Sequence, residues 1–373
     1  MTFSKPNKRI LFFAEDPGAA NYIAPLAPLL SREKIDVSIR SAGKAREIFN
    51  QMNSEHKAVD NGETAKQITN HYNPDIIIVG TSENPDTIGL SLISEAKNND
   101  IESIGVIDAP AFPEYRFRGR AENPLSHSPD WLLVPDKVTM QRYANLGFPV
   151  EKIKAFGHPH FEQMLARSVT LLGSGQARLR NKIFGNGPNK HPIILFISEI
   201  SDGFQKKDFQ CLNTDNLHGR GGSKERTKIV LEEVLDALKE ISPTPFFVLR
   251  LAPKDQANEF AAYLDEIDEI SSSGAVLPLL CAADIVIGLT SMPIYEAALL
   301  GKPTLSILPN PEQRHWLPSI QLGLTELAIT RGEVREKLLK GLKPHSARQA
   351  YEGAILHRPE GVTDQILSFI REL

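Results

Sequence analysis

The sequence predicts an α/β protein with two parallel-sheet domains. Short apolar runs alternate with helical segments of roughly ten residues, which is the pattern of strands covered on both faces by crossover helices. The chain has 373 residues, more than the ~100–200 of one domain. A Gly-, Pro- and Asn-rich stretch, 166–190, separates two sets of strands and predicts a linker. We therefore expect an N-terminal domain over 1–165 and a C-terminal domain over 191–373, each Rossmann-like and the two facing a cleft.

In the first domain, apolar runs predict six strands. In a parallel sheet of this kind, ligands bind at the carboxyl ends of the strands. The predicted strands are Arg9–Ala14, Asp36–Arg40, Ile76–Gly80, Ser103–Ile107, Trp131–Pro135 and Lys152–Phe156. The polar residues that follow them are Glu15, Asp16, Ser82, Glu83 and Asp108.

The first strand opens directly into the turn EDPGAAN and a helix over 22–30. Its one glycine, Gly18, does not make the GxGxxG dinucleotide fingerprint, so an NAD site is not expected. Small residues would let a ligand approach closely, and Asp16 and Asn21 could bind its hydroxyls. Alternatively, Gly18 supplies a positive φ and Asp16 caps the helix.

An irregular stretch over 111–129 has no helix or strand period, which in a compact domain favours a functional or mobile loop. Its alternating Arg116, Arg118 and Arg120 could project together toward an anion, or form a solvated rim. His158 follows the last strand in GHPH, where it could orient a phosphate or act as a base, or be a hydrogen-bonded structural histidine.

The second domain begins with a strand over Ile193–Ile197, and Ser198 starts a long loop that could fold over a ligand. A helix over 225–239 with one apolar stripe follows. The next strand, Phe246–Leu251, places Arg250 and Lys254 near its carboxyl end. Short strands are expected at Val276–Pro278 and Ala328–Thr330. The terminal helix, 363–373, has an apolar stripe for which the first domain is one packing partner.

The stretch from Ala282 to Pro309 reads as strand, polar turn, helix and strand. Ser291 is the expected N-cap of the helix, which ends at Gly301. Free backbone N–H groups and the hydroxyls of Thr290 and Ser291 at a positive helix end are suited to a phosphate. Glu296 could then accept hydrogen bonds from ribose hydroxyls. The alternative is an ordinary capped helix with a solvated glutamate.

Composition excludes several classes of function. A net charge of −4 and a pI near 6.2 give no electrostatic case for nucleic acid or anionic membrane. Two cysteines without metal spacing fit a reducing compartment. The first apolar run breaks at Glu15, so no signal peptide or transmembrane segment is expected. We predict a cytoplasmic enzyme without a metal or cofactor; peripheral association with an inner membrane stays open.

Four motifs in this order resemble the GT-B nucleotide-sugar enzymes of bacteria: AEDPGAAN, the segment ending in GHP, RLAPKD and ADIVIGLTSMPIYEAALLGKPTLSI. Lipid A disaccharide synthase, UDP-N-acetylglucosamine 2-epimerase and the CDP-glycerol polymer transferases are the similar families. The resemblance implies that Thr290 and Ser291 bind the donor's phosphates and that Glu296 binds its ribose. Asp108 stands where the epimerases carry an acidic catalytic residue, whereas Met292-Pro293 replaces their glycine pair.

The resulting functional prediction is a glycosyltransferase that uses a nucleoside-diphosphate sugar, UDP favoured, in surface-polysaccharide assembly. Asp16 or Asp108 would accept the proton of a saccharide or lipid-linked acceptor. Arg250 or Lys254 would help to hold the diphosphate, and Gly18, Asn21, Ser198 and His158 complete the substrate-binding candidates. Alternatives are a UDP-N-acetylglucosamine 2-epimerase, hydrolysing or not, that uses Asp108 and Glu83, a CDP-polyol phosphate transferase, and a non-catalytic nucleotide-sugar-binding protein.

Overall fold

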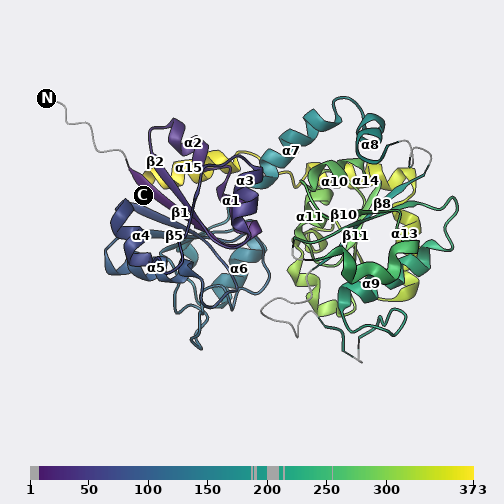
Figure 1. Cartoon of the computed structure of the whole chain (residues 1–373), viewed down its shortest axis with the longest axis horizontal. Helices are drawn as coiled ribbons and strands as arrows, with labels where there is room; N and C mark the ends of the chain where they lie inside the picture. Colours follow the sequence, from purple (N-terminus) through teal and green to yellow (C-terminus); the bar gives the residue numbers. More distant parts are fainter. Residues whose placement is uncertain (1–7, 186–187, 189–190, 200–209, 213–214, 254) are drawn as a thin grey trace. The chain divides into compact units, whose positions relative to one another are not determined.

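The computed structural model contains two compact units, each built around one parallel sheet (Figure 1). It describes residues 8–185, 188, 191–199, 210–212, 215–253 and 255–373. The first unit comprises the chain up to Gln163 together with Pro359–Leu373, and the second comprises Met164–Arg358. The predicted α/β class, with two parallel-sheet domains, is confirmed.

The first sheet has seven parallel strands in the order β3-β2-β1-β4-β5-β6-β7. Its central strands consist of buried apolar residues; Phe12, for example, lies in register with Ile39 and Ile78 on its two neighbours. The strands are β1 (Arg9–Ala14), β2 (Asp36–Ser41), β3 (Lys57–Ala58), β4 (Ile76–Gly80), β5 (Glu102–Val106), β6 (Trp131–Leu133) and β7 (Ile153–Lys154). Because β1, β4, β5 and β6 are adjacent and parallel, their carboxyl ends share one edge.

Helices cover both faces of this sheet. The expected helix over 22–30 is two helices, because Pro25 separates them, while Pro28 lies in the first turn of the second, where proline is tolerated. The terminal helix α15 belongs to the first unit (Figure 1). Its Ile366 and Ile370 share a buried apolar cluster with Ile10 and Phe12 of β1. The helices are α1 (Pro17–Ile23), α2 (Ala27–Arg32), α3 (Ala45–Gln51), α4 (Ala65–Tyr72), α5 (Ile88–Asn98), α6 (Lys137–Asn145), the 3₁₀ turn η1 (Val150–Lys152), α7 (Pro159–Leu172, which leads into the second unit) and α15 (Val362–Glu372).

The second sheet has six parallel strands in the order β10-β9-β8-β11-β12-β13. They are β8 (Ile193–Ile197), β9 (Phe246–Arg250), β10 (Glu269–Ser271), β11 (Ile285–Gly288), β12 (Thr304–Ile307) and β13 (Glu326–Ala328). The helical segments are α8 (Gln176–Phe184), α9 (Arg226–Leu238), η3 (Ala257–Glu266), α10 (Leu277–Ala282), α11 (Met292–Leu299), η4 (Pro311–Trp316), α12 (Pro318–Gln321), α13 (Arg331–Gly341) and α14 (Pro344–Ile355).

One predicted strand is wrong. Residues 276–278 begin helix α10, with a proline in its first turn, and the edge strand is β10, which the sequence analysis missed. The stretch expected as a linker is largely helical, in α7 and α8. Leu179 of α8 packs against Cys281 and Ala282, and Arg180 donates to the Ala282 carbonyl at 2.8 Å. Apolar docking, which local Gly and Asn content does not reveal, therefore orders this segment.

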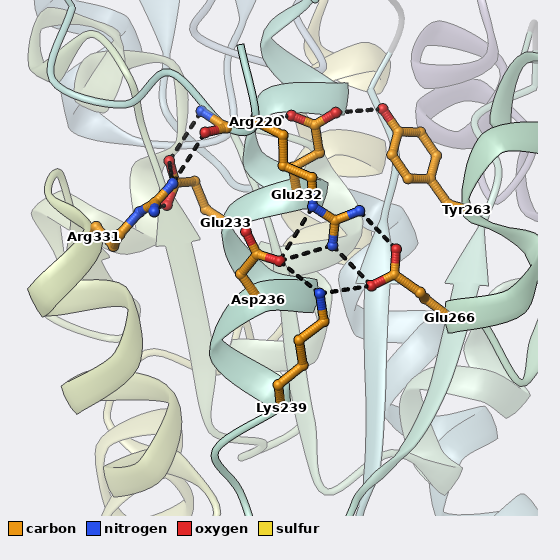
Figure 2. Close-up of polar contacts among 9 residues, drawn as sticks. Arg220, Glu232, Glu233, Asp236, Lys239, Tyr263, Glu266 and Arg331 are labelled. Atoms are coloured by element: carbon orange, nitrogen blue, oxygen red, sulfur yellow. Dashed lines mark hydrogen bonds and ion pairs between the residues drawn. The ribbon is translucent and has the colours of Figure 1, made fainter. Parts of the chain in front are cut away.

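A network of charged side chains ties the loop before α9 to the C-terminal half of that helix and to the end of η3 (Figure 2). Arg220, in the loop before the helix, donates to Asp236 at 2.8 Å and to Glu266 at 2.6 and 2.8 Å. Its backbone N–H donates to Glu232 at 2.5 Å. Gly219 has φ +57°, and a Cβ there would lie 2.2 Å from a Glu232 carboxylate oxygen, so this turn requires glycine. Among the described residues, no helix is both long and apolar enough to cross a membrane.

Candidate active site

Polar residues from β1, β4 and β5 meet at the carboxyl edge of the first sheet. Asp16, Glu83 and Asp108 each follow one of these adjacent strands, so the parallel topology collects them. Their charges are within electrostatic range of one another and of Arg116. Asn84 also donates from its side-chain amide to Glu15 at 2.8 Å. The sheet therefore concentrates carboxylates from distant parts of the sequence in one place.

Arg116 is the cation of this cluster, and it comes from the irregular loop after β5. Its Nη1 lies 3.0 Å from Asp108 Oδ1, and the two side chains are 7% and 16% exposed. The guanidinium also donates to the Thr81 hydroxyl and to the Ala111 carbonyl, both at 3.4 Å. Phe112, beside it, is held at φ +54°, which is rare for a bulky side chain and is typical of functional sites.

The three alternating arginines do not project together, so that interpretation is wrong. Arg118 lies over the Tyr115 ring, 4.5 Å from its centroid. Arg120 is exposed and makes a bidentate ion pair with Asp86, with hydrogen bonds of 2.7 and 2.6 Å. The loop is irregular, so strand-like alternation of its side chains does not apply.

Gly18 contacts the cluster directly. It lies in the first turn of α1 without a positive φ, so the turn interpretation is wrong. A Cβ on Gly18 would lie 1.8 Å from Asp108 Oδ2, which means that only glycine admits the Asp108 carboxyl here. Asp16 stands at the N-cap position of α1, but its side chain makes no capping hydrogen bond. It interacts with Ser82 instead.

Burial and neighbouring charges change the proton affinities of Asp16 and Glu83. Burial raises the pKa of Asp16, and nearby Asp108 adds to this effect while Ser82 and Arg116 oppose it. Burial raises the pKa of Glu83 to about 7, with Asp16 and Asp108 contributing and Arg116 opposing. Glu83 is thus poised to gain or lose a proton near neutral pH, whereas Asp108 is ion-paired with Arg116. Carboxyl groups kept in different environments are typical of acid–base pairs.

Two other predicted residues of the first unit have different surroundings. Asn21 is half-buried on α1. His158 is buried between Tyr22 and Phe161, with ring centroids 4.8 and 4.7 Å away. Burial, with a contribution from His160, lowers the pKa of His158 well below its usual value, so the ring is neutral. This environment is that of a structural histidine.

The second unit has its own polar cluster where β8 and β11 end. The Glu199 carboxylate accepts the Thr290 backbone N–H at 3.0 Å and its hydroxyl at 2.6 Å. Arg226 Nη2 lies 2.8 Å from the same carboxylate, and Arg226 Nη1 donates to Gln313 at 2.5 Å. The predicted phosphate-binding donors of Thr290 are therefore already bonded to an internal anion.

The other residues of this predicted turn keep part of the expected geometry. Ser291 is the N-cap of α11, but its side chain makes no capping hydrogen bond. Pro293 removes one backbone donor from the first turn of the helix. Glu296 is buried, so the solvated alternative for this residue is wrong.

The remaining candidates of the second unit hold neighbouring loops. Ser198 donates to Asp255 at 2.5 Å and accepts the Ala252 N–H at 2.7 Å. Arg250 donates at 2.8 Å to Ser271 of the edge strand β10, which is separated from β11 by β9 and β8. Burial lowers the pKa of Arg250. Lys254 lies outside the described residues.

Sequence reasoning missed two residues that the fold brings to these clusters and did not distinguish a third from its neighbours. Arg116 was treated as one of three equivalent arginines, and Glu199 and Arg226 were not singled out. A charged residue directly after a buried strand was the available signal for Glu199, as it was for Asp16. Nothing local distinguishes Arg226, since only tertiary packing buries a charge at the start of a helix. No group of three or more potential metal ligands occurs in the part of the chain that the structure describes.

Comparison with known proteins finds no matching protein-family model and no matching curated protein. Solved structures do match over almost the whole chain. The UDP-GlcNAc 2-epimerase from Neisseria meningitidis bound to UDP-GlcNAc is 14% identical, with a TM-score of 0.70 over 98% of this chain and 100% of that chain. MnaA of S. aureus, in a co-structure with UDP, is 14% identical, with a TM-score of 0.69 and coverage of 98% and 96%. HepE of Anabaena, in complex with UDP and glucose, is 13% identical, with a TM-score of 0.68 and coverage of 98% and 100%.

A likeness at this level of identity shows a shared fold. The chain has the two-domain, GT-B-like fold that the motifs predicted, over its whole length. UDP-GlcNAc 2-epimerases, one of the families that the sequence resembles, are among the structures that share it.

Proposed function

We propose that this protein is an enzyme of nucleotide-sugar metabolism that changes the configuration of the sugar of UDP-GlcNAc or a similar UDP-sugar by acid–base chemistry. One observation carries the proposal: Asp16, Glu83 and Asp108 gather around Arg116, and burial raises the pKa of two of these carboxyls. Similarity over the full chain to epimerases of UDP-GlcNAc supports it. The epimerase alternative is therefore preferred here to glycosyl transfer.

Inversion at a carbon that bears hydrogen needs a base on one side of the carbon and an acid on the other. Asp108, ion-paired with Arg116, is suited to take the proton. Glu83, whose pKa is raised to about 7 by burial, is suited to supply one. Arg116 would stabilise negative charge that develops during the reaction, since it is already fixed by Asp108, Thr81 and Ala111.

For the nucleotide we keep the Thr290–Ser291 turn as the proposed diphosphate site and Glu296 as the proposed ribose ligand. A helix N-terminus with a nearby arginine favours an anion. The Glu199 carboxylate bonded to Thr290 shows that this turn accommodates an anionic group, but it also means that a phosphate must replace it there. Binding of UDP should therefore depend on Glu199 as well as on Thr290.

Glycosyl transfer from a UDP-sugar in surface-polysaccharide assembly is the second candidate. Met292 and Pro293 favour glycosyl transfer, because the epimerases that the sequence resembles carry a glycine pair at this position. Pro293 also lacks the backbone N–H that a glycine would supply there. In that reaction Asp16 or Asp108 would take the proton of an acceptor hydroxyl.

Incubation of the protein with UDP-GlcNAc alone in D₂O, followed by NMR, separates these functions. The proposal expects a new epimer, as UDP-sugar or as free sugar with UDP, with deuterium at the inverted carbon. Loss of UDP-GlcNAc only when a saccharide or lipid-linked acceptor is added would favour the transferase. Binding without turnover in either case would contradict both the epimerase and the transferase. Thermal-shift assays with UDP, CDP, GDP and TDP would then identify which nucleobase the protein binds.

Two variants of the irregular loop after β5, here called the arginine loop because it carries Arg116, Arg118 and Arg120, give this assay a test and a matched control. Arg116→Ala should abolish turnover, because it removes the cation from the carboxylate cluster. Arg120→Ala, four residues further on, removes only an exposed ion pair with Asp86 and should behave like the wild type. Equal activity of the two variants would contradict the assignment of the site.

A further inference from the structure

Five buried side-chain atoms at the carboxyl edge of the first sheet have no hydrogen-bond partner among the described residues. A buried polar atom without a partner costs about 1–3 kcal/mol, so such atoms usually bind a water or a ligand. They are Glu15 Oε2, Arg116 Nε, Asp136 Oδ2, Thr139 Oγ1 and the Tyr143 hydroxyl. Three of their parent residues, Arg116, Thr139 and Tyr143, are more than nine-tenths buried.

Helix α6 holds the arginine loop at two points on either side of Arg116. Arg142 donates to the Pro110 carbonyl at 2.6 Å. The ring of Tyr143 packs edge-on against Phe117, with ring centroids 6.0 Å apart. The Tyr143 hydroxyl is therefore near the Arg116 guanidinium, and the two groups interact electrostatically. Burial raises the pKa of Tyr143, so the phenol is neutral.

Arg116 uses its terminal nitrogens for Asp108, Thr81 and Ala111, which leaves Nε as its remaining donor. Thr139 and Tyr143 are four residues apart on α6, so their side chains lie on the same face of the helix. A buried water typically makes about three hydrogen bonds. Arg116 Nε, Thr139 Oγ1 and the Tyr143 hydroxyl supply that number.

We propose that these three atoms bind one internal water behind the Asp108–Arg116 pair, and that Tyr143 and Thr139 are positioning residues of the candidate active site. The water would fix Nε and with it the plane of the guanidinium, so that Nη1 keeps its contact with Asp108. The effect on catalysis rests on the proposed function, whereas the water site itself does not.

Tyr143→Phe removes the hydroxyl and keeps the ring against Phe117, so the variant should fold with an unchanged or slightly lower Tm. With UDP-GlcNAc as the probe substrate, kcat should fall about tenfold at unchanged KM, the effect of one lost hydrogen bond of typical strength. The pH profile should shift as well, because a less ordered Arg116 interacts less with Glu83. Thr139→Val should act in the same direction.

Tyr72→Phe is the matched control. Its hydroxyl lies near Asp36 and Arg9, at the starts of β2 and β1 and therefore at the opposite edge of the sheet, and burial raises its pKa in the same way. This variant should leave kcat and the pH profile unchanged. Equal kinetics of the Tyr143 and Tyr72 variants, both folded, would overturn the positioning role.

NMR of the Arg116 Nε–H provides a readout that does not need activity. In the wild type this proton should exchange slowly with solvent, and Tyr143→Phe should accelerate the exchange by at least about tenfold. A crystal structure that shows ordered waters should place one within hydrogen-bond distance of all three atoms. If the wild type turned over no nucleotide sugar, the proposed function would fail, while slow exchange and the water would still support this site; fast exchange in the wild type would overturn it.

Discussion

Glu199→Gln is the substitution with the sharpest consequence for the proposed nucleotide site. Glu199 and Thr290 are joined by hydrogen bonds of 3.0 and 2.6 Å, and the same carboxylate lies 2.8 Å from Arg226. A diphosphate bound by Thr290 must displace this carboxylate. Glutamine has nearly the same shape and still accepts a hydrogen bond, but it carries no charge. The variant therefore isolates the charge of the internal anion.

The size of the effect follows from these bonds. A hydrogen bond to a charged acceptor contributes about 1.5–3 kcal/mol and a neutral one about 1 kcal/mol. Release of Thr290 should thus become easier by about 1–2 kcal/mol, which is about 5–30-fold in the affinity for UDP. Arg226, which is almost fully buried, then faces a neutral amide in place of the Glu199 carboxylate, so Tm without nucleotide should fall and UDP should restore it.

Isothermal titration calorimetry with UDP, and with uridine as a ligand without phosphate, measures this directly. Glu199→Gln should tighten UDP and leave uridine unchanged. Glu225→Gln is the matched control, because this residue lies just before α9, is 41% exposed and pairs with Lys228 of the same helix. If the folded Glu199 variant bound UDP no more tightly than the wild type, Glu199 would be a structural cap and the diphosphate would not lie at Thr290.

Three further predictions concern the carboxylate cluster and the α9 network. Glu83→Gln should remove the change of kcat with pH near pH 7, which a rate profile across pH measures. Because the pKa of Glu83 is about 7 in the folded protein and 4.5 ordinarily, the wild type should lose stability as pH rises from 4.5 to 7, and the variant should not; chemical denaturation across pH tests this. Gly18→Ala should lower kcat about a hundredfold, because the added Cβ displaces Asp108. Gly332→Ala, at an exposed helix start with open space around it, should leave kcat unchanged. Steady-state kinetics of the two variants compares them. Arg220→Ala removes ion pairs with Asp236 and Glu266 and should lower the free energy of unfolding by about 1–2 kcal/mol. Arg335→Ala removes an exposed ion pair with Glu240 and should lower it by less than about 0.5 kcal/mol. Equal effects of the two variants in urea titrations would contradict a stabilising role of the Arg220 network.

Much of the fold could be predicted because the strands of a parallel sheet are buried on both faces and therefore read as continuous apolar runs. Arg9–Ala14, Ile76–Gly80 and Ile193–Ile197 have the predicted bounds for this reason. The edge strand β10, Glu269–Ser271, has a polar composition and no such run, so it was missed. The Gly and Asn content around α8 suggested a linker, because local composition does not report the surface on which a helix docks.

Part of the candidate site could likewise be predicted from the sequence, and part could not. Asp16, Asp108 and Thr290 follow apolar strands, and the parallel topology alone brings such residues to one edge of a sheet. Which of the three loop arginines pairs with Asp108 depends on how an irregular loop of buried aromatic residues packs, and no sequence period encodes that. The sequence by itself determined the two sheets and the edges where chemistry is expected. Only the tertiary structure decided that Arg116 is the cation in one cluster and that Glu199 occupies the donors of Thr290 in the other, because long-range contacts between side chains set both pairings.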